Sequence, residues 1–420
     1  MGTEYSIDEL IDFSIGGGWG TESPEPEHTL VSVIRGTDIP RVAAGELSSV
    51  PQRFESNRKL KSRLLEAGDV ILEVAGGSAA RGQFTGRTLL VTDEIIEQLG
   101  PTICASFCKR LVLRHDLVEP KFFFYFMQDF YKSGRVADYD SQSTGISNFR
   151  FAEFLSNETV ELPSRPEQTA VSGFLGLLDQ RIRLNDQITR TLESIAQALF
   201  RSWFVDFDPV RAKMAGEKPA GMDDATAALF PDSMEDSELG YIPVGWEVRT
   251  VGKVLYRHPT KGLPKSTLLS GEGTALVLTQ GDNVVAGFAD VQPQVQSSAQ
   301  DPHFIFGDHT CRMHLSTLPF SVLPNTLVLS ARALDCYWAY HATLGRQTFE
   351  SYRRHWSELA QKTVIVPGVD PAAAFGRVVK PLYAFRDSLM LEKFHLQIVR
   401  DALLPRLISG ELQIPEDLVA

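Results

Sequence analysis

The chain has 420 residues, of which 43% are hydrophobic, and this length is enough for two or three domains with cores of their own. The acidic beginning of the chain is unlike a secretory signal, and no apolar run approaches the roughly 18 residues of a membrane span, so we expect a cytoplasmic protein without membrane contact. A formal charge of −12 argues against a protein that coats nucleic acid alone, although it leaves room for local basic surfaces.

The chain begins with a predicted domain over residues 1–163. Thr29–Ile34 alternates and is rich in β-branched residues, and Val70–Val74 follows a Gly-Asp pair, so both stretches predict strands. Aromatic residues between Tyr125 and Tyr131 recur at helical spacing after Pro120. Short strands mixed with helices in this order indicate an α+β domain.

A long helix is predicted next, over residues 164–207, because apolar residues repeat on one face and polar residues on the other. Alternate steps of three and four residues from Val171 give a heptad seam. Asn185 stands at an a-type position of this seam, where it would help to set the register at some cost in stability. About 38 residues at ~1.5 Å each would span on the order of 55 Å. The residues predicted to face a partner are Leu178, Asn185, Ile188, Leu192, Ile195, Leu199 and Trp203.

A linker rich in proline and glycine is predicted over residues 208–246, followed by a second domain over residues 247–366. Its strand candidates are Leu276–Leu278, Phe304–Phe306 and Thr326–Leu329. Two matches between the domains are expected, Leu327–Leu329 with Val70–Leu72 and Tyr337–Tyr340 with Phe122–Phe126.

A second long helix is predicted over residues 367–410, with a tail over residues 411–420. Shifted by 204 residues, its seam repeats that of the first helix without a gap, and the polar residues before the helix recur as well. We interpret this as one unit, a domain followed by a long helix, that is present twice; the alternative is two unrelated amphipathic helices that share leucines. Pro381 predicts a kink, or pairing that begins only beyond it. The pairing residues predicted here are Leu389, Leu396, Val399 and Leu403.

Nothing in the sequence predicts catalysis or a metal site. No Ser-His-Asp order, metal-spaced histidine pair or P-loop lysine is present. Gly16–Gly20 is interpreted as a turn rather than a cofactor loop, and Asp206–Pro209 as a helix end rather than a methyltransferase motif. The cysteines lack a C-x-x-C pair and are interpreted as buried thiols rather than metal ligands. They are Cys104, Cys108, Cys311 and Cys336.

Basic and polar clusters are the candidate nucleic-acid contacts, because arginines, hydroxyls and amides suit phosphates and base edges. The stretch Gly345–Arg354 in the second domain is the positional counterpart of Ser141–Asn148 in the first. For any single residue a solvated surface charge is the alternative, whereas paired clusters in duplicated domains favour nucleic acid. The predicted contacts are Arg53, Arg58, Lys59, Lys61, Arg63, Arg81, Arg87, Ser143, Thr144, Asn148, Arg150, Lys261, Lys265, Arg346, Arg353 and Arg354.

Three stretches, Leu192–Gly216, Ala220–Val248 and Arg400–Leu412, resemble the specificity subunit of type I restriction–modification systems. The two domains resemble that family in layout only. The resemblance implies an α+β fold with two duplicated target-recognition domains, each of which contacts half of a split DNA sequence. It also implies that the two long helices pack antiparallel as a coiled coil with pseudo-two-fold symmetry, and that the chain itself is not catalytic.

The resemblance further implies the partners, which are double-stranded DNA, two methyltransferase subunits docked on the helices, and a motor/nuclease subunit for restriction. S-adenosylmethionine would lie on the methyltransferase subunits, which modify adenine N6, and this chain would carry no cofactor. The second domain departs from the family layout in being short. Three other classes of function stay open, which are a degenerate fused methyltransferase or nuclease, a coiled-coil scaffold, and a stand-alone DNA-binding protein.

Overall fold

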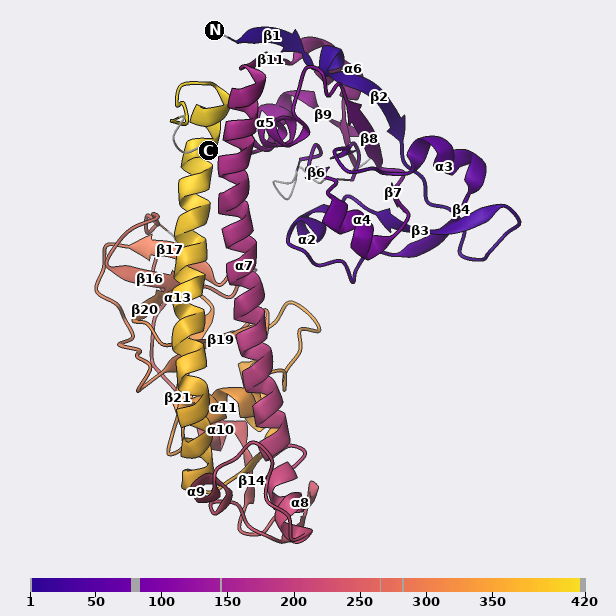
Figure 1. Cartoon of the computed structure of the whole chain (residues 1–420). Coiled ribbons are helices and arrows are strands. Elements are labelled where there is room, and N and C mark those ends of the chain that lie inside the picture. Colours follow the sequence, from indigo (N-terminus) through magenta and orange to yellow (C-terminus); the bar gives the residue numbers. More distant parts are fainter. Residues whose placement is uncertain (1, 77–83, 144–145, 265, 282, 416–420) are drawn as a thin grey trace. The chain divides into compact units, whose positions relative to one another are not determined.

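The computed structural model describes residues 2–76, 84–143, 146–264, 266–281 and 283–415 (Figure 1). The chain divides into two compact units. The first comprises the residues up to Arg183 together with those from Val399 onward, and the second comprises Leu184–Ile398. Each of the two long helices therefore contributes one part to each unit.

The first unit contains an α+β domain, called the first domain, and the beginning of the long helix α7. Its elements are β1 (Thr3–Ser6), α1 (Ile7–Leu10), β2 (Ile11–Gly16), β3 (His28–Ile34), α2 (Ile39–Ala43), β4 (Gln52–Ser56), α3 (Asn57–Arg63), β5 (Val70–Glu73), β6 (Thr88–Leu90), α4 (Asp93–Leu99), β7 (Thr102–Cys104), β8 (Cys108–Leu113), α5 (Pro120–Lys132), η2 (Arg135–Tyr139), β9 (Asp140–Ser143), β10 (Ile146–Phe149), α6 (Phe151–Asn157), β11 (Thr159–Leu162) and α7 (Arg165–Phe204). The strands form a four-stranded sheet in the order β2-β8-β5-β6, a three-stranded sheet in the order β4-β3-β7, and the pairs β1-β11 and β9-β10.

The second unit contains a further α+β domain, called the second domain, between parts of α7 and α13. Its elements after α7 are α8 (Asp208–Met214), α9 (Asp224–Ala227), β12 (Met234–Ser237), β13 (Gly240–Pro243), β14 (Glu247–Thr250), α10 (Val251–Val254), β15 (Leu255–Arg257), β16 (Ala275–Leu278), β17 (Val285–Ala289), β18 (His303–Gly307), β19 (Met313–Ser316), β20 (Phe320–Val322), β21 (Thr326–Ala331), α11 (Cys336–Thr343), α12 (Trp356–Gln361), β22 (Thr363–Val366) and α13 (Val369–Ile408). The sheets have the orders β15-β21-β18-β19 and β17-β16-β20, with the pairs β14-β22 and β12-β13.

The two domains have the same topology. Each domain has a four-stranded sheet, in which the third and fourth strands in spatial order are also neighbours in sequence. Each domain also has a three-stranded sheet with one parallel pair, which is β3-β7 in the first domain and β16-β20 in the second. A terminal pair of strands, β1-β11 or β14-β22, closes each domain before a long helix. The duplication and the α+β class are therefore confirmed, whereas the exact domain boundaries stay predictions.

One of the two expected matches between the domains is wrong. Leu327–Leu329 lies in β21, which occupies the place of β8, and Val70–Leu72 lies in β5, whose counterpart is β18. The strands β5 and β21 are both short and largely apolar, so similarity of sequence alone pairs them although they are not counterparts. The aromatic match holds, because α5 follows β8 and α11 follows its counterpart β21.

Capping and strand alternation explain how these elements form locally. The Glu119 carboxylate accepts a hydrogen bond from the Phe122 amide at the start of α5, and Asp335 accepts from the amides of Tyr337 and Trp338 at the start of α11. In β3, Val31 and Val33 join one apolar cluster while Ile34 joins another, so both faces of this sheet are covered.

Within the first unit, the beginning of α7 packs against the end of α13. Val171 and Leu175 of α7 share one core with Leu404 and Leu407 of α13. Asp179 of α7 forms an ion pair with Arg400 of α13, at 2.7 Å.

Within the second unit, the end of α7 packs against the beginning of α13. The Phe375 ring lies 5.7 Å from Phe200 and 5.6 Å from Phe204. Two ion pairs join the helices, Asp186 with Lys393 and Glu193 with Arg386. Each step of seven residues backward along α7, from 193 to 186 to 179, matches a step of seven forward along α13, so the helices are antiparallel with one register in both units.

The predicted seam is correct in half of its positions and shifted by one residue in the other half. The residues buried on α7 follow one another from Val171 in steps of four and then three, whereas the prediction used steps of three and then four. As a result Ala196 is buried, while Ile195 is 44% exposed. On α13 the same shift buries Arg386 and leaves Val399 45% exposed. Ile195 and Val399 are therefore corrected as pairing residues, and Asn185 occupies a d-type position. The pattern misleads because apolar residues stand at both candidate positions, and because the true positions on α13 hold cations that pair with acids.

Most of the other predicted seam residues lie along the pairing face. Trp203, Leu389 and Asn185 are buried, and the others on this face are half-buried, which are Leu178, Leu192, Leu199, Leu396 and Leu403. Ile188 is half-buried as well, but it belongs to the shifted half of the seam, where Thr189 takes its place. Pro381 neither ends α13 nor delays its pairing, because the helix is continuous through it and Phe375 and Val379 are already buried. Pro381 itself is exposed, so water can satisfy the carbonyl that loses its helical donor.

The cysteines differ in burial. Cys104 and Cys108 are buried in the first domain, and burial raises the pKa of the Cys104 thiol to about 12. Cys311 and Cys336 are only half-buried. Among the described residues, no group of three or more His, Cys, Asp or Glu is placed to hold a metal, and no helix is long and apolar enough to cross a bilayer.

Asn185 provides a direct test of the pairing face. Its side chain is fully buried, and neither its amide oxygen nor its amide nitrogen has a hydrogen-bond partner among the described residues. We expect Asn185→Leu to raise the free energy of unfolding by about 1–3 kcal/mol, because a buried unpaired amide is removed. Urea unfolding followed by circular dichroism measures this, with the exposed Gln187→Leu as control. Loss of stability in Asn185→Leu would show that the amide is satisfied in solution.

The ion pair of Asp186 with Lys393 predicts a pH dependence of stability. Burial by itself raises the pKa of Asp186, but the hydrogen bonds and charges of Lys393 and Arg190 outweigh it and lower the pKa below its usual value. The stabilisation is therefore present above the unfolded pKa of about 3.9 and is lost as the pH falls through the folded value. We expect the melting temperature to fall less between pH 7 and pH 2 in Asp186→Asn than in the unchanged chain. Asp290→Asn, at an exposed position of the second unit, is the control and should follow the unchanged chain.

Candidate nucleic-acid interface

In the first domain, two segments that carry predicted contacts lie against each other. The connection from β5 to β6 meets the β9–β10 hairpin, where the Gly76 amide donates to the Ser147 carbonyl at 3.1 Å and the Phe149 amide donates to the Val74 carbonyl at 2.9 Å. An isolated bridge joins Ala75 to Asn148. We name this meeting of a strand connection with the segment before α6 the first junction.

Side chains hold the first junction together. Asp140 accepts hydrogen bonds from Thr85 Oγ1, at 2.8 Å, and from Ser147 Oγ. Arg150 lies at the exposed end of the hairpin, where it donates to Glu153 and to the carbonyl of Asp138. Of the predicted contacts here, Asn148 is half-buried and Arg150 is exposed.

Arg81, Thr144 and Lys265 lie outside the described residues, and Ser143 is described only as the last backbone position of β9.

Arg87 has a structural partner. Its guanidinium makes two hydrogen bonds with Glu73, of 2.7 and 2.6 Å, and the Glu73 carboxylate is buried. The hydrogen bonds that Arg87 donates to Glu73 raise the pKa of its guanidinium above the usual value. These two hydrogen bonds satisfy both the guanidinium and the carboxylate. Arg87 could therefore contact DNA only if it broke its ion pair with the buried Glu73.

The five cations between Arg53 and Arg63 lie together, on β4 and α3, but most of them face carboxylates. Arg53 stacks over the Trp19 ring at 4.8 Å and pairs with Glu22 at 3.3 Å. Lys59 and Arg63 lie 3.3 and 3.8 Å from the buried Glu55. Two members remain exposed without an ion pair in the part of the chain that the structure describes, namely Arg58 and Lys61.

The second domain repeats the junction with different parts. The turn from β18 to β19 meets the segment between α11 and α12, which is the topological place of the β9–β10 hairpin. The His355 amide donates to the carbonyl of Asp308 at 2.9 Å and lies 3.1 Å from its carboxylate, and His309 Nδ1 donates to the Arg353 carbonyl at 3.0 Å. We name this the second junction.

Exposed aromatic and basic side chains lie on the second junction. The Tyr352 side chain is 81% exposed, and its ring stacks on His309 with centroids 4.7 Å apart and planes at 9°. Arg354 is 78% exposed and 3.8 Å from Asp308, whereas Arg353 pairs with Glu350 and Glu358.

Tyr352 and His309 were not predicted from the sequence. Tyr352 lies inside Gly345–Arg354, which the sequence predicts as a candidate contact segment. An aromatic residue next to two arginines is a sequence pattern that indicates such a contact. His309 lies 43 residues earlier, and only the fold brings the two rings together.

The remaining predicted contacts lie near or apart from the second junction. Arg346 follows α11 and donates to the Ala342 carbonyl at 3.3 Å, and Lys261 is exposed in the connection from β15 to β16. Both junctions thus combine exposed arginine with polar or aromatic groups on a segment held by hydrogen bonds, which suits contact with phosphates and base edges.

No family model matches the chain, but known proteins are similar to it. It is 39% identical over 331 residues to the type I restriction enzyme HindI specificity subunit of Haemophilus influenzae, covering 61% of this chain and 70% of that protein. It is 22% identical over 334 residues to the type I restriction enzyme MjaIX specificity subunit of Methanocaldococcus jannaschii, covering 73% of this chain and 72% of that protein.

Among solved structures, the fold is similar to that of a type I restriction–modification system S subunit from M. genitalium. The TM-score is 0.56, with 16% identity, over 96% of this chain and 95% of that chain. At this identity the likeness concerns the fold alone.

The pairing of Arg87 with Glu73 separates a structural role from a contact with nucleic acid. We expect Arg87→Met to lower the free energy of unfolding by about 3 kcal/mol, because Glu73 stays buried without its partner. Arg58→Met, at an exposed position without an ion pair among the described residues, should change it by less than about 0.5 kcal/mol. Chemical unfolding of the two variants measures the difference. If Arg87→Met keeps its stability, the ion pair is not what holds this connection.

Proposed function

The chain belongs to the specificity subunits of type I restriction enzymes, and from that membership we propose that it contacts a bipartite DNA target, one half-site with each domain. The observation that carries the proposal is the duplication of the junction. In each domain the same two topological segments meet and present arginine at the surface. One protein with two such surfaces can contact two separate base sequences on one duplex.

Direct contact with DNA is proposed for the two junctions. In the first, Asn148 and Arg150 supply an amide and a guanidinium, which suit adenine, guanine or phosphate. In the second, Arg354 supplies the exposed cation and Tyr352 an aromatic face that can pack on bases or sugars. The buried or paired carboxylates Glu73, Asp140 and Asp308 hold these segments in place, and a held segment loses less entropy on binding.

The charge of −12 supports the idea that the chain does not act on DNA alone. Partner subunits that close around the duplex would supply the remaining positive charge, since sequence-independent affinity for DNA rises with the number of neutralised phosphates. We propose two methyltransferase subunits as these partners, with a motor/nuclease subunit joining for restriction. S-adenosylmethionine would then be bound by the methyltransferase subunits, and this chain would perform no chemistry itself.

Two equivalent exposed residues support the number of two methyltransferase subunits. Ile195 on α7 and Val399 on α13 stand 204 residues apart, at the same position of the duplicated helix, and both are nearly half exposed. On α7, Leu184 is exposed on the same face as Ile195. Single exposed apolar residues are common on protein surfaces, so the support comes from the equivalence of the two positions, since two equivalent sites would receive two copies of one subunit.

The test is adenine methylation by the complex of this chain with its methyltransferase subunits. We expect Tyr352→Ala and Arg354→Ala each to lower the methylation rate of the target by roughly 5- to 150-fold, the effect of losing about 1–3 kcal/mol of DNA contact. Arg249→Ala is the matched control, since this arginine on β14 is also exposed and pairs only with Glu247 among the described residues. Sequencing of methylated adenines in the presence and absence of the chain identifies the target.

Two results would contradict the proposal. Methylation that is independent of the chain would show that it does not direct the enzyme. Methylation that is unchanged in both variants of the second junction would show that DNA contact lies elsewhere on the domain.

A further inference from the structure

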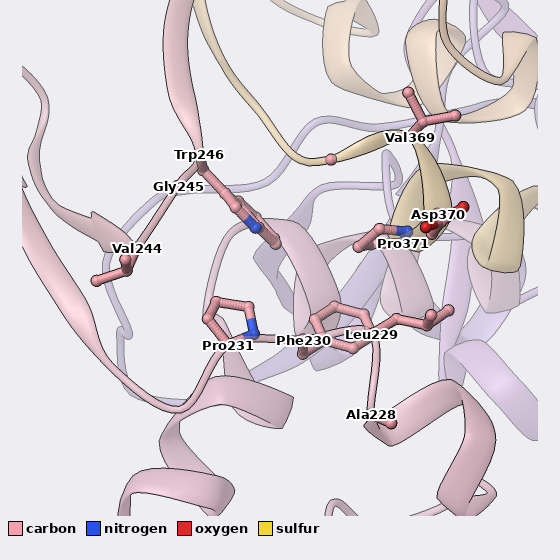
Figure 2. Close-up of a pocket in the computed structure, with 11 residues that line it drawn as sticks. Ala228, Leu229, Phe230, Pro231, Val244, Gly245, Trp246, Val369, Asp370 and Pro371 are labelled. Carbon is pink, nitrogen blue, oxygen red and sulfur yellow. The ribbon is translucent and has the colours of Figure 1, made fainter.

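A pocket of about 490 Å³ lies in the second unit, away from the second junction (Figure 2). The segment after α9, the turn after β13 and the start of α13 form its walls. Figure 2 shows Trp246 on one side, Phe230 and Pro231 below, and Val369, Asp370 and Pro371 on the other side. Its volume lies in the range of roughly 300–1,000 Å³ that is typical of binding pockets, which is room for more than one side chain.

Apolar side chains line most of the pocket, while backbone groups and the Asp370 carboxylate add polar surface. The Trp246 side chain packs against Phe204, Phe207 and Phe230, with ring centroids 5.7 to 6.4 Å apart. At the rim, Val369 is 59% exposed and Val244 is 43% exposed. Trp246 and Phe230 are themselves only 6% and 1% exposed, so they support the wall from behind, and the two valines are the exposed apolar groups that another protein can cover.

Carboxylates stand at or near the rim of this pocket. Asp370, in the first turn of α13, is exposed and forms no hydrogen bond or ion pair among the described residues. On the opposite side, the Glu235 carboxylate accepts a hydrogen bond of 2.8 Å from the amide of Gly245, which is itself part of the pocket wall. Glu235 is not part of the pocket wall itself, so a cation in the pocket would meet Asp370 at the rim and Glu235 only behind the turn at Gly245.

The surroundings of the pocket are negative as well. The 30 residues from Pro219 to Val248 include seven aspartates and glutamates and no lysine, arginine or histidine. The flanking Lys218 and Arg249 pair with two of these acids, Asp224 and Glu247, and Lys213 donates to the carbonyl of Phe230. The excess of negative charge therefore comes from the other five acids. On the β12–β13 hairpin, which leads into the pocket wall, Asp236 and Glu238 are exposed. Such a surface repels phosphate groups and attracts cationic protein segments, so it complements a basic protein and not DNA.

We propose that this pocket receives an arginine-bearing segment of the methyltransferase subunit. Arginine fits better than lysine, because its planar guanidinium donates several hydrogen bonds to carboxylates and carbonyls while its carbon stem packs on the exposed valines of the rim. The proposal rests on the proposed function, since it takes the methyltransferase subunit as the partner. It adds a contact at the start of α13, in addition to the exposed residues along the long helices.

The experiment measures assembly of the full-length chain with purified methyltransferase subunit by surface plasmon resonance. We expect Asp370→Lys to weaken the complex by about tenfold or more at ~0.1 M salt, and Asp370→Asn to weaken it less, in the order of the charge change. Asp93→Lys is the matched control. Asp93 also lies exposed in the first turn of a helix, α4, and forms no ion pair among the described residues. Thermal unfolding of each variant verifies that the fold is intact.

The outcomes separate this inference from the proposed function. If the unchanged chain does not bind the methyltransferase subunit, the partner assignment fails and this inference fails with it. If the unchanged chain binds and Asp370→Lys binds equally well, only the pocket assignment is overturned. It is also overturned if Asp370→Lys alters self-association in sedimentation, or DNA affinity in a gel shift, without altering assembly, because the occupant is then a second copy of the chain or nucleic acid.

Discussion

The register between α7 and α13 depends on three ion pairs spaced by seven residues, Asp179 with Arg400, Asp186 with Lys393 and Glu193 with Arg386. Apolar seam residues favour close packing, but they allow neighbouring registers of similar energy. Each ion pair forms only when its two positions face each other, and a shift by one turn would separate all three. The arrangement therefore combines affinity from apolar burial with specificity from charge.

The pair of Glu193 with Arg386 also fastens the second domain to the helix. Arg386 is almost fully buried and donates to Glu193, to Asp387 and to the carbonyl of Leu315. Asp387 in turn accepts from the amide and hydroxyl of Thr317, both at 2.7 Å. The end of strand β19 is thus attached to α13 by hydrogen bonds to Arg386 and Asp387, and these hydrogen bonds satisfy both charged groups. A buried network of this kind tolerates little displacement, because any loosened partner is left unpaired in a low dielectric.

The two copies of the module have diverged where symmetry would be harmful. The positions of the cations Arg386, Lys393 and Arg400 on α13 correspond to uncharged residues on α7, namely Ile182, Thr189 and Ala196. If α13 paired with a second α13, these cations would lack the acids that α7 provides, so the charges favour pairing of the two different helices within one chain. The junctions have diverged as well, since a hydrogen-bonded hairpin in the first domain is replaced in the second by a segment with the His309–Tyr352 stack. Equivalent topology with unlike surfaces suits two unlike half-sites.

The sequence by itself determined the class of fold, the duplication, the long helices and the family, because these features are local or repeat at a fixed spacing. Heptad periodicity is visible in one helix alone, and a shift of 204 residues is visible in the chain alone. Only the tertiary structure decided which step of the seam is buried, because Ile195 and Ala196 are equally acceptable inside a helix and the partner helix selects between them. The same holds for the candidate contacts. Sequence brought Arg53, Lys59, Arg63 and Arg87 forward as free cations, yet each faces a carboxylate, and for Arg87 and Glu73 the partner lies 14 residues away. Composition records how many charges a segment carries, but whether a charge is free for a ligand depends on which groups the fold places within a few ångströms of it.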